Sequence, residues 1–200
     1  MKKIAFAFLA AVSLMAQTSC DSASKLAEDI DGSWSSAPEM LANTPDGLIT
    51  GVDNFVFSKT ESTSGTLMIA TMISVNREIP VDDESTDPVS LTASAKATVQ
   101  GTWIAADDDE IRLVIDPASI KVEIDPEGIV AVPSLITEVD APTTDSIPPA
   151  LAAALKKEIL KVMTAKYIGL SQMDDVEIKD GRMKYEVENT HYIMSLQTQD

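Results

Sequence analysis

The side chains of this chain that could do chemistry are its one histidine, its one cysteine and several short runs of carboxylates. His191 lies in a segment whose pattern predicts a strand, and no Gly-x-Ser-x-Gly sequence accompanies it to supply a nucleophile. The carboxylates cluster at 82–84, 107–110 and 174–175, so abundance alone selects no pair for general acid and base catalysis. The run at 107–110 offers oxygens for weak calcium binding but lacks the EF-hand spacing, which favours a solvated turn. We therefore expect no enzymatic activity, no metal site and no cofactor.

Cys20 follows directly on an apolar run near the N-terminus. Lys2 and Lys3 precede an uncharged apolar segment from Ile4 to Ala16, which is shorter than the roughly 20 residues that a membrane-spanning helix needs. This order predicts a secretory signal peptide. Because the chain has one cysteine, neither an intrachain disulfide nor a cluster of metal-bound thiolates is expected.

Two processing routes compete for this leader. An ordinary signal-peptidase site requires small residues at two positions, which Ala16 and Thr18 satisfy only in part. The alternative uses Cys20 itself: the basic start, the short apolar core and the small pair Thr18 and Ser19 resemble a bacterial lipoprotein leader, although Gln17 stands where that leader usually has leucine. A third interpretation is that Cys20 is an incidental residue of the leader.

The lipoprotein resemblance implies that the signal peptide ends at residue 19 and that Cys20 becomes the acylated first residue of the mature chain. Acyl chains such as palmitate would then attach the protein to the bacterial outer membrane or cell surface, on a face that the sequence leaves open. We expect the lipid anchor to be the only contact with the membrane.

The charge of the chain limits its partners. The formal net charge is −17, and the expected signal peptide carries two of the lysines, so the mature protein is more acidic still. A surface of this charge repels nucleic acid and anionic lipid headgroups, so neither is expected as a ligand. Protein partners are left open.

The body of the chain, residues 30–200, is expected to form one domain behind a tether at 20–29. Hydrophobic residues make up 44% of the sequence, which is enough to fill a core. The tether prediction rests on the small and charged residues between Cys20 and Ile30. The alternative is that Leu26 and Ile30 begin a short helix or strand.

An unbroken alternation of apolar or small residues with polar ones runs from Val89 to Trp103. Period two over this length predicts a strand with one solvated face. The strand would be far longer than usual and must therefore coil or bend, which Ala93, Ala95 and Ala97 make sterically easy.

Turn residues predict two hairpins. Asp116 and Pro117 separate two alternating runs within 111–124, and Asp180-Gly181 separates two runs near the C-terminus. Three further strands are predicted at "DNFVFSK", "GTLMIATMISVN" and "HYIMSLQ". The second of these is apolar on both faces, which is typical of a central strand.

One segment breaks the β pattern and predicts a helix at about 149–167, with Pro149 in its first turn. Its apolar positions have helical spacing and its lysines lie on the opposite side: Leu151, Leu155, Ile159, Val162 and Met163 against Lys156, Lys157 and Lys161. Such a helix could bind a membrane surface or a partner, but we expect it to pack on its own sheet.

These elements predict a mostly β protein, with an antiparallel barrel or strongly curved sheet of about six to eight strands and one late amphipathic helix. Gly32 and Trp34 resemble the Gly-x-Trp entry of lipocalin-like barrels, and the pattern recurs at Gly101 and Trp103. The resemblance implies a noncatalytic envelope domain that holds a small apolar ligand inside the barrel. The alternative is a structural or protein-interaction module with a filled core and no ligand.

Overall fold

The computed structural model describes residues 22–45, 47–79, 89–124, 128–133 and 149–197. The expected signal peptide, Cys20 and the carboxylate run at 82–84 therefore lie outside the described residues.

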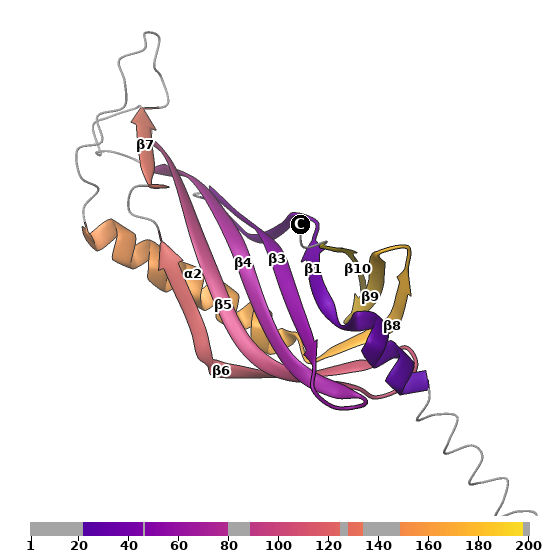
Figure 1. Ribbon diagram of the computed structural model, residues 1–200. Coiled ribbons are helices and arrows are strands. Elements are labelled where there is room, and N and C mark those ends of the chain that lie inside the picture. The colour runs from indigo at the N-terminus through magenta and orange to yellow at the C-terminus, as the bar shows by residue number, and fades with distance from the viewer. Residues whose placement is uncertain (1–21, 46, 80–88, 125–127, 134–148, 198–200) are drawn as a thin grey trace, which may run out of the picture.

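A single antiparallel sheet dominates the structure, and its long strands coil strongly around one another (Figure 1). The strands are β1 (Gly32–Ser36), β2 (Glu39–Thr44), β3 (Gly47–Lys59), β4 (Ser64–Ile79), β5 (Val89–Ala105), β6 (Ile111–Ile124), β7 (Val130–Pro133), β8 (Gln172–Lys179), β9 (Arg182–Val187) and β10 (Thr190–Leu196). The prediction of a mostly β protein with a curved antiparallel sheet is confirmed. The described residues contain more strands than expected, because β2 and β7 pair only with the ends of longer strands.

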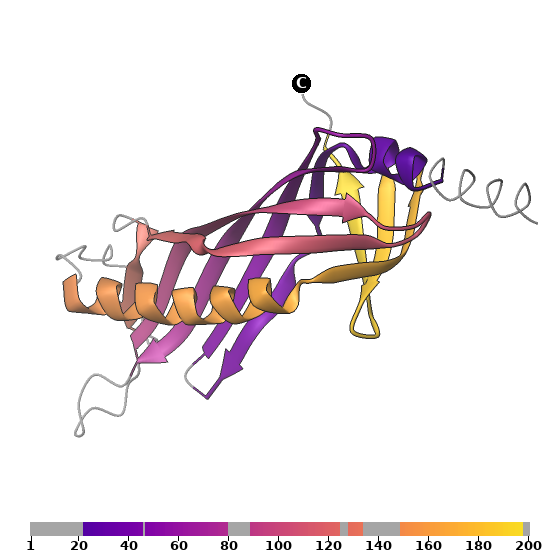
Figure 2. The same cartoon turned by 90° about the horizontal axis from the view of Figure 1, so that it is seen from below.

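The strand pairings return nearly to their starting point. They run from β3 through β4, β5, β6, β8, β9 and β10 to β1, which pairs again with β3. The link between β6 and β8 is narrow, since only Ile111 with Met173 and Arg112 with Gln172 are paired there. Beyond that link the ring stays open, and the helix α2 (Pro149–Gly169) packs against β6, β5 and β2 (Figure 2).

The strand β5 has the two faces that its alternation predicts. Its inward positions Leu91, Ala97 and Val99 are buried, whereas Thr92 and Lys96 are exposed. The strand β4 is central, between β3 and β5, as expected. Only one of its faces is buried, however, and the methionines of the other face are exposed to solvent.

The predicted hairpin at 111–124 is wrong. This segment is one strand, β6, and both of its halves pair with β5. The turn chemistry is present: the Asp116 side chain accepts a hydrogen bond from the backbone N–H of Ala118 at 2.9 Å, and the Ser119 hydroxyl accepts one from the N–H of Gln100 at 2.8 Å. These residues form a bulge, because the long β5 offers a partner to the chain on either side of the turn.

The C-terminal hairpin is confirmed. Asp180 and Gly181 have φ values of 52° and 71°, and they connect β8 to β9 through the paired residues Lys179 and Arg182. Positive φ at both positions matches the right-handed twist of the flanking strands.

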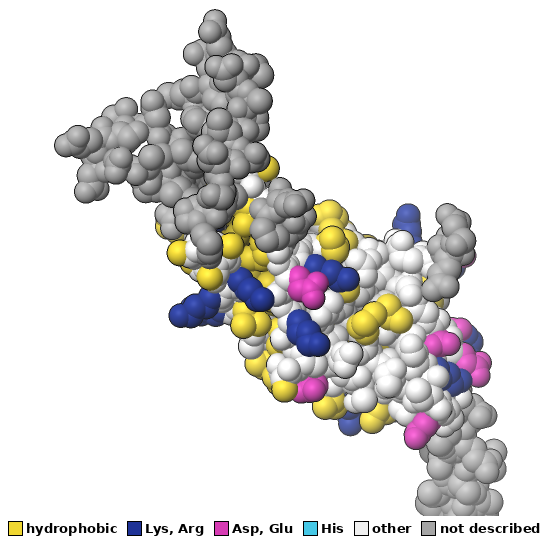
Figure 3. Space-filling model, turned by 60° about the vertical axis from the view of Figure 1, so that its left-hand side comes forward, with side chains coloured by type: hydrophobic (Ala, Val, Ile, Leu, Met, Phe, Trp, Pro, Cys, Tyr) yellow, Lys and Arg dark blue, Asp and Glu magenta, His cyan; other side chains and the backbone are white. Residues whose placement is uncertain are grey.

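The helix α2 begins at Pro149 as predicted and ends two residues later than expected. Its buried stripe consists of Leu155, Ile159, Met163 and Tyr167, which face the sheet as expected. The lysines of the opposite side are exposed. Figure 3 brings forward the side of the molecule that is on the left in Figure 1, and several Lys and Arg side chains lie on this face. Among the described helices, none has the length and apolar character required to cross a bilayer.

The structure corrects the prediction of a tether at 20–29, because the described part of this segment belongs to a helix over residues 22–30. Leu26, Ala27 and Ile30 of this helix are buried in the core, and the indole N–H of Trp34 donates to the carbonyl of Ile30 at 2.8 Å. The alternative of a short helix beginning near Leu26 therefore describes this segment better. Within the described residues, the folded body therefore begins at residue 22.

Candidate functional site

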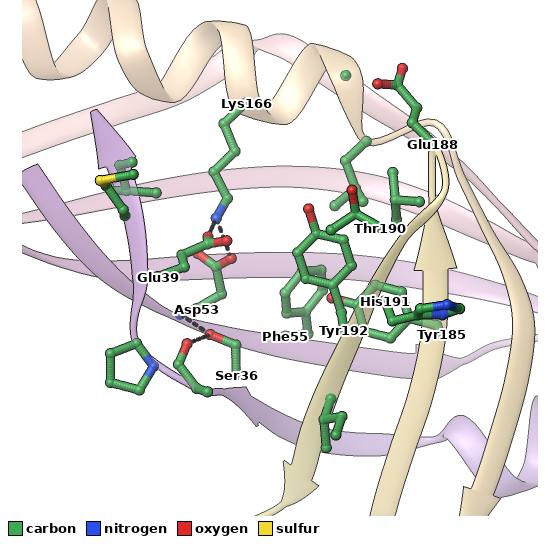
Figure 4. A pocket seen from close by; sticks show the side chains of 18 of the residues that line it. Ser36, Glu39, Asp53, Phe55, Lys166, Tyr185, Glu188, Thr190, His191 and Tyr192 are labelled. Atoms are coloured by element: carbon green, nitrogen blue, oxygen red, sulfur yellow. Dashed lines mark hydrogen bonds and ion pairs between the residues drawn. The ribbon is translucent and has the colours of Figure 1, made fainter. Parts of the chain in front are cut away.

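A pocket of about 600 Å³ opens between β2, the C-terminal end of α2 and the β9–β10 hairpin (Figure 4). The apolar part of its lining includes Leu41, Phe55, Leu170, Tyr185, Tyr192 and Ile193. The ionisable part consists of Glu39, Asp53, Lys166, Glu188 and His191. This combination of an apolar wall with a few polar groups is typical of small-molecule sites.

A chain of polar side chains forms one side of the pocket. Asp53 is only 4% exposed, and its carboxylate accepts a hydrogen bond from the Thr71 hydroxyl at 2.5 Å. The Tyr167 hydroxyl lies 2.6 Å from the same Thr71 oxygen, and it must donate there because the proton of Thr71 goes to the carboxylate. On the other side, the Lys166 ammonium lies 2.7 Å from Asp53 Oδ2 and also contacts the Glu39 carboxylate.

The strand register and the helix explain how these residues meet. Asp53 occupies an inward position of β3 between Gly51 and Phe55, and the register of β3 with β4 places Thr71 directly opposite. Lys166 is adjacent to the buried Tyr167 at the end of α2, so the packing of the helix carries both side chains to Asp53. The backbone N–H of Asp53 donates to the Ser36 hydroxyl at 2.9 Å, which ties β3 to the end of β1.

Burial perturbs the ionisation of this cluster. Desolvation raises the pKa of Asp53 to about 6, against the opposing effect of the hydrogen bond from Thr71. Desolvation also lowers the pKa of Lys166 to about 8. Around neutral pH both groups are mainly charged, so the ion pair persists. The pKa of each group is nevertheless closer to 7 than it would be in water.

Aromatic rings make up much of the apolar wall. Tyr185 and Tyr192 are stacked, with ring centroids 5.3 Å apart and ring planes inclined by 15°. Phe55, which also lines the pocket, stacks on Phe57 at a centroid distance of 5.9 Å. Burial raises the pKa of Tyr185, so this phenol stays neutral. The wall therefore presents aromatic surfaces beside the carboxylates.

The residues of the Gly-x-Trp patterns lie away from this pocket. Trp34 is 1% exposed on β1, and Trp103 is fully buried on β5, where its indole N–H donates to the carbonyl of Thr66 at 3.0 Å. Gly32 and Gly101 belong to the same two strands, and a Cβ on Gly101 would meet the carbonyl oxygen of Val114 at 2.5 Å. All four residues serve the core and the strand contacts.

His191 lines the rim of the pocket, although its side chain is 82% exposed and its Nδ1 lies 3.4 Å from the Glu186 carboxylate. The carboxylates at 107–110 form the turn between β5 and β6, and Asp174 accepts a hydrogen bond from Gln172 at 2.6 Å. Within the described part of the chain, no group of three or more His, Cys, Asp or Glu residues has metal-binding geometry.

The polar cluster was not predicted from the sequence, although the alternation of one segment indicates part of it. The segment "DNFVFSK" predicts a strand, and in its alternation Asp53 shares the inward face with Phe55 and Phe57. A carboxylate on the buried face of a strand needs a polar partner, so the alternation of this segment indicates that Asp53 is an unusual residue for its position. No comparable signal identifies Lys166 as that partner.

Comparison with known proteins gave no relatives: no family model, no curated protein and no solved structure matches this chain. The pocket must therefore be interpreted from its own residues.

Proposed function

We propose that this protein is an exported envelope lipoprotein whose lipocalin-like domain binds a small molecule in the pocket between β2, α2 and the β9–β10 hairpin. The observation that carries the proposal is the pocket itself, with about 600 Å³ of space against an aromatic wall. A volume of this size fits a small organic molecule.

The chemistry of the lining refines the expected ligand. The lipocalin resemblance implies a small apolar ligand, but Asp53, Lys166 and Glu39 place charged groups inside the pocket. A molecule that combines an apolar body with a polar group matches this lining better. Met40 and Ile193 are 63% and 54% exposed at the rim, so the approach to the pocket is apolar as well.

Native mass spectrometry of the protein from its source cells tests ligand binding. We expect the wild-type protein to retain a small-molecule adduct after gentle purification. Ala165 lines the pocket, so Ala165→Trp should fill part of the space and abolish the adduct. Ala154→Trp is the matched control, because Ala154 is exposed on the same helix and does not line the pocket.

Circular dichroism and thermal unfolding should show that both tryptophan variants are folded. A clean ligand-free mass for the wild-type protein would contradict the proposed function. That result would favour a structural or protein-interaction module instead.

The proposed anchor is the acylated Cys20. The helix over residues 22–30 packs into the core, so only Asp21 would stand between the acylated Cys20 and this helix. Two or more acyl chains hold a protein firmly on a membrane, and so short a connection would keep the domain close to the lipid surface.

Metabolic labelling with an alkyne analogue of palmitate tests the anchor. Cys20→Ala should abolish labelling and move the protein from the membrane fraction to the soluble fraction. Gln17→Leu is the control, because it restores the residue usual in lipoprotein leaders and should leave labelling intact or increase it. Unchanged membrane retention of Cys20→Ala would rule out this anchor.

A further inference from the structure

The ionisable groups of the pocket are unequal in number. Three carboxylates line it, those of Glu39, Asp53 and Glu188, against the single ammonium of Lys166. His191 is largely exposed at the rim and lies beside a fourth carboxylate, that of Glu186. Among the described lining residues, negative charge therefore exceeds positive charge.

The ammonium of Lys166 is already committed. It lies 2.7 Å from Asp53 Oδ2 and also contacts the carboxylate of Glu39, and its side chain is only 21% exposed. A bound anion would have to draw this ammonium away from two carboxylates and leave the buried Asp53 uncompensated. Breaking a buried ion pair in this way is strongly unfavourable, so the pocket is poorly suited to an anionic ligand.

The aromatic wall favours positive charge for a second, independent reason. Tyr185 and Tyr192 stack at 5.3 Å beside Phe55, and all three residues line the same pocket (Figure 4). The face of an aromatic ring attracts a cation within about 6 Å, and the attraction strengthens where water is excluded. A cationic group in this pocket can therefore contact both π surfaces and carboxylates.

We infer that the pocket selects an organic cation, an amine or quaternary ammonium group carried on an apolar body. This inference rests on the proposed function, because it names the chemical class of the ligand for the same pocket. The cationic group lies against the aromatic wall, within reach of the lining carboxylates, while the apolar body lies along Leu41 and the apolar rim at Met40 and Ile193.

Calorimetric titration with three probes that share one alkyl chain tests the inference: octyltrimethylammonium, octyl sulfate and octanol, each below its micelle-forming concentration. We expect the ammonium probe to bind at least about tenfold more tightly than either of the other probes. One cation–π contact and one contact with a carboxylate together account for a difference of this size. Ala165→Trp should weaken that binding by a similar factor.

Matched charge variants separate binding in the pocket from general attraction to an acidic protein. Glu39→Gln and Glu188→Gln each remove one carboxylate of the lining, and we expect each to weaken binding of the ammonium probe about threefold or more. Glu123→Gln removes one exposed carboxylate outside the lining and should leave the affinity unchanged. Glu188 is exposed, so its variant stays informative even if Glu39→Gln disturbs folding.

The outcomes distinguish this inference from the proposed function. Equal affinity for the three probes, with each lost in Ala165→Trp, would overturn the cation inference and leave the pocket as a ligand site. A preference for ammonium that all the lining variants leave unchanged would show attraction to the surface only and would overturn the inference as well. Absence of any small-molecule adduct in native mass spectrometry would contradict the proposed function itself.

Discussion

Replacing Lys166 by methionine removes the only ammonium from a buried cluster that otherwise holds two carboxylates. The methionine keeps most of the apolar stem at the end of α2, so the main change is the loss of charge. Asp53 is 4% exposed and would lose its ion pair at 2.7 Å. Breaking a buried pair by removing one partner typically costs about 3–5 kcal/mol, and we expect the free energy of unfolding to fall by about that much at pH 7, where both Asp53 and Lys166 are mainly charged.

The cost should depend on pH through Asp53. Burial raises the pKa of this carboxyl from 3.8 to about 6 in the folded protein, which corresponds to roughly 3 kcal/mol between its two protonation states. Between these two values the folded state keeps a proton that the unfolded state loses, so stability decreases as the pH rises through the window. In Lys166→Met the pKa of Asp53 should rise further, because the compensating ammonium is gone. The variant should therefore lose less stability at pH 5, where Asp53 is mainly protonated, than at pH 7.

Urea unfolding followed by circular dichroism at pH 5 and pH 7 measures these differences. Asp53→Asn retains an acceptor for the Thr71 hydroxyl and should abolish the pH dependence that Asp53 contributes. The double variant Asp53→Asn/Lys166→Met should be more stable than the sum of the two single effects predicts, because the unpaired charge is then absent. Lys161→Met is the control on the exposed side of the same helix and should change stability by less than about 0.5 kcal/mol.

Two results would refute this account of the cluster. One is a stability of Lys166→Met within about 0.5 kcal/mol of the wild type at both pH values, which is the usual range for surface substitutions. The other is strict additivity in the double variant, which would mean that Asp53 and Lys166 do not interact.

Two further predictions concern the packing of the fold. Met163→Ala should lower the free energy of unfolding by about 2–5 kcal/mol, because Met163 is fully buried between α2 and the sheet. Leu160→Ala on the exposed side of the same helix should lower it by less than about 1 kcal/mol. Chemical denaturation of the two variants measures this difference. Gly65→Ala should lower stability by about 1–3 kcal/mol, because a Cβ there would meet the carbonyl oxygen of Ser58 at 2.1 Å. Gly169→Ala, where a Cβ meets nothing within 4 Å, should be neutral or slightly stabilising; equal melting temperatures for the two glycine variants would contradict the prediction.

Much of the fold follows from local patterns of the sequence. The alternation along β5 predicts which face of that strand is buried, because successive side chains of a strand point to opposite faces. The turn at Asp180-Gly181 is predictable because both residues adopt positive φ at little cost. The stripe on α2 is predictable because its apolar residues recur at helical spacing.

The two wrong predictions, the hairpin at 111–124 and the tether at 20–29, have a common cause. In both segments, contacts with distant parts of the chain determine the structure. The residues around Asp116 have the chemistry of a turn, but a turn can close a hairpin or form a bulge, and the long β5 pairs with the chain on both sides of it. The segment 22–30 reads as a tether because it is short and charged. Its few apolar side chains fold it into a helix only because the end of the sheet offers them a place to be buried.

The sequence by itself determined the β character of this protein, the faces of its strands and helix, and the residues on which the proposed anchor depends. These are local properties, since periodicity and turn chemistry extend over a few residues. The pocket was decided by the tertiary structure alone. Asp53 and Lys166 lie far apart in the chain, and only the register of β3 on β4 and the packing of α2 across the open side of the sheet bring them together.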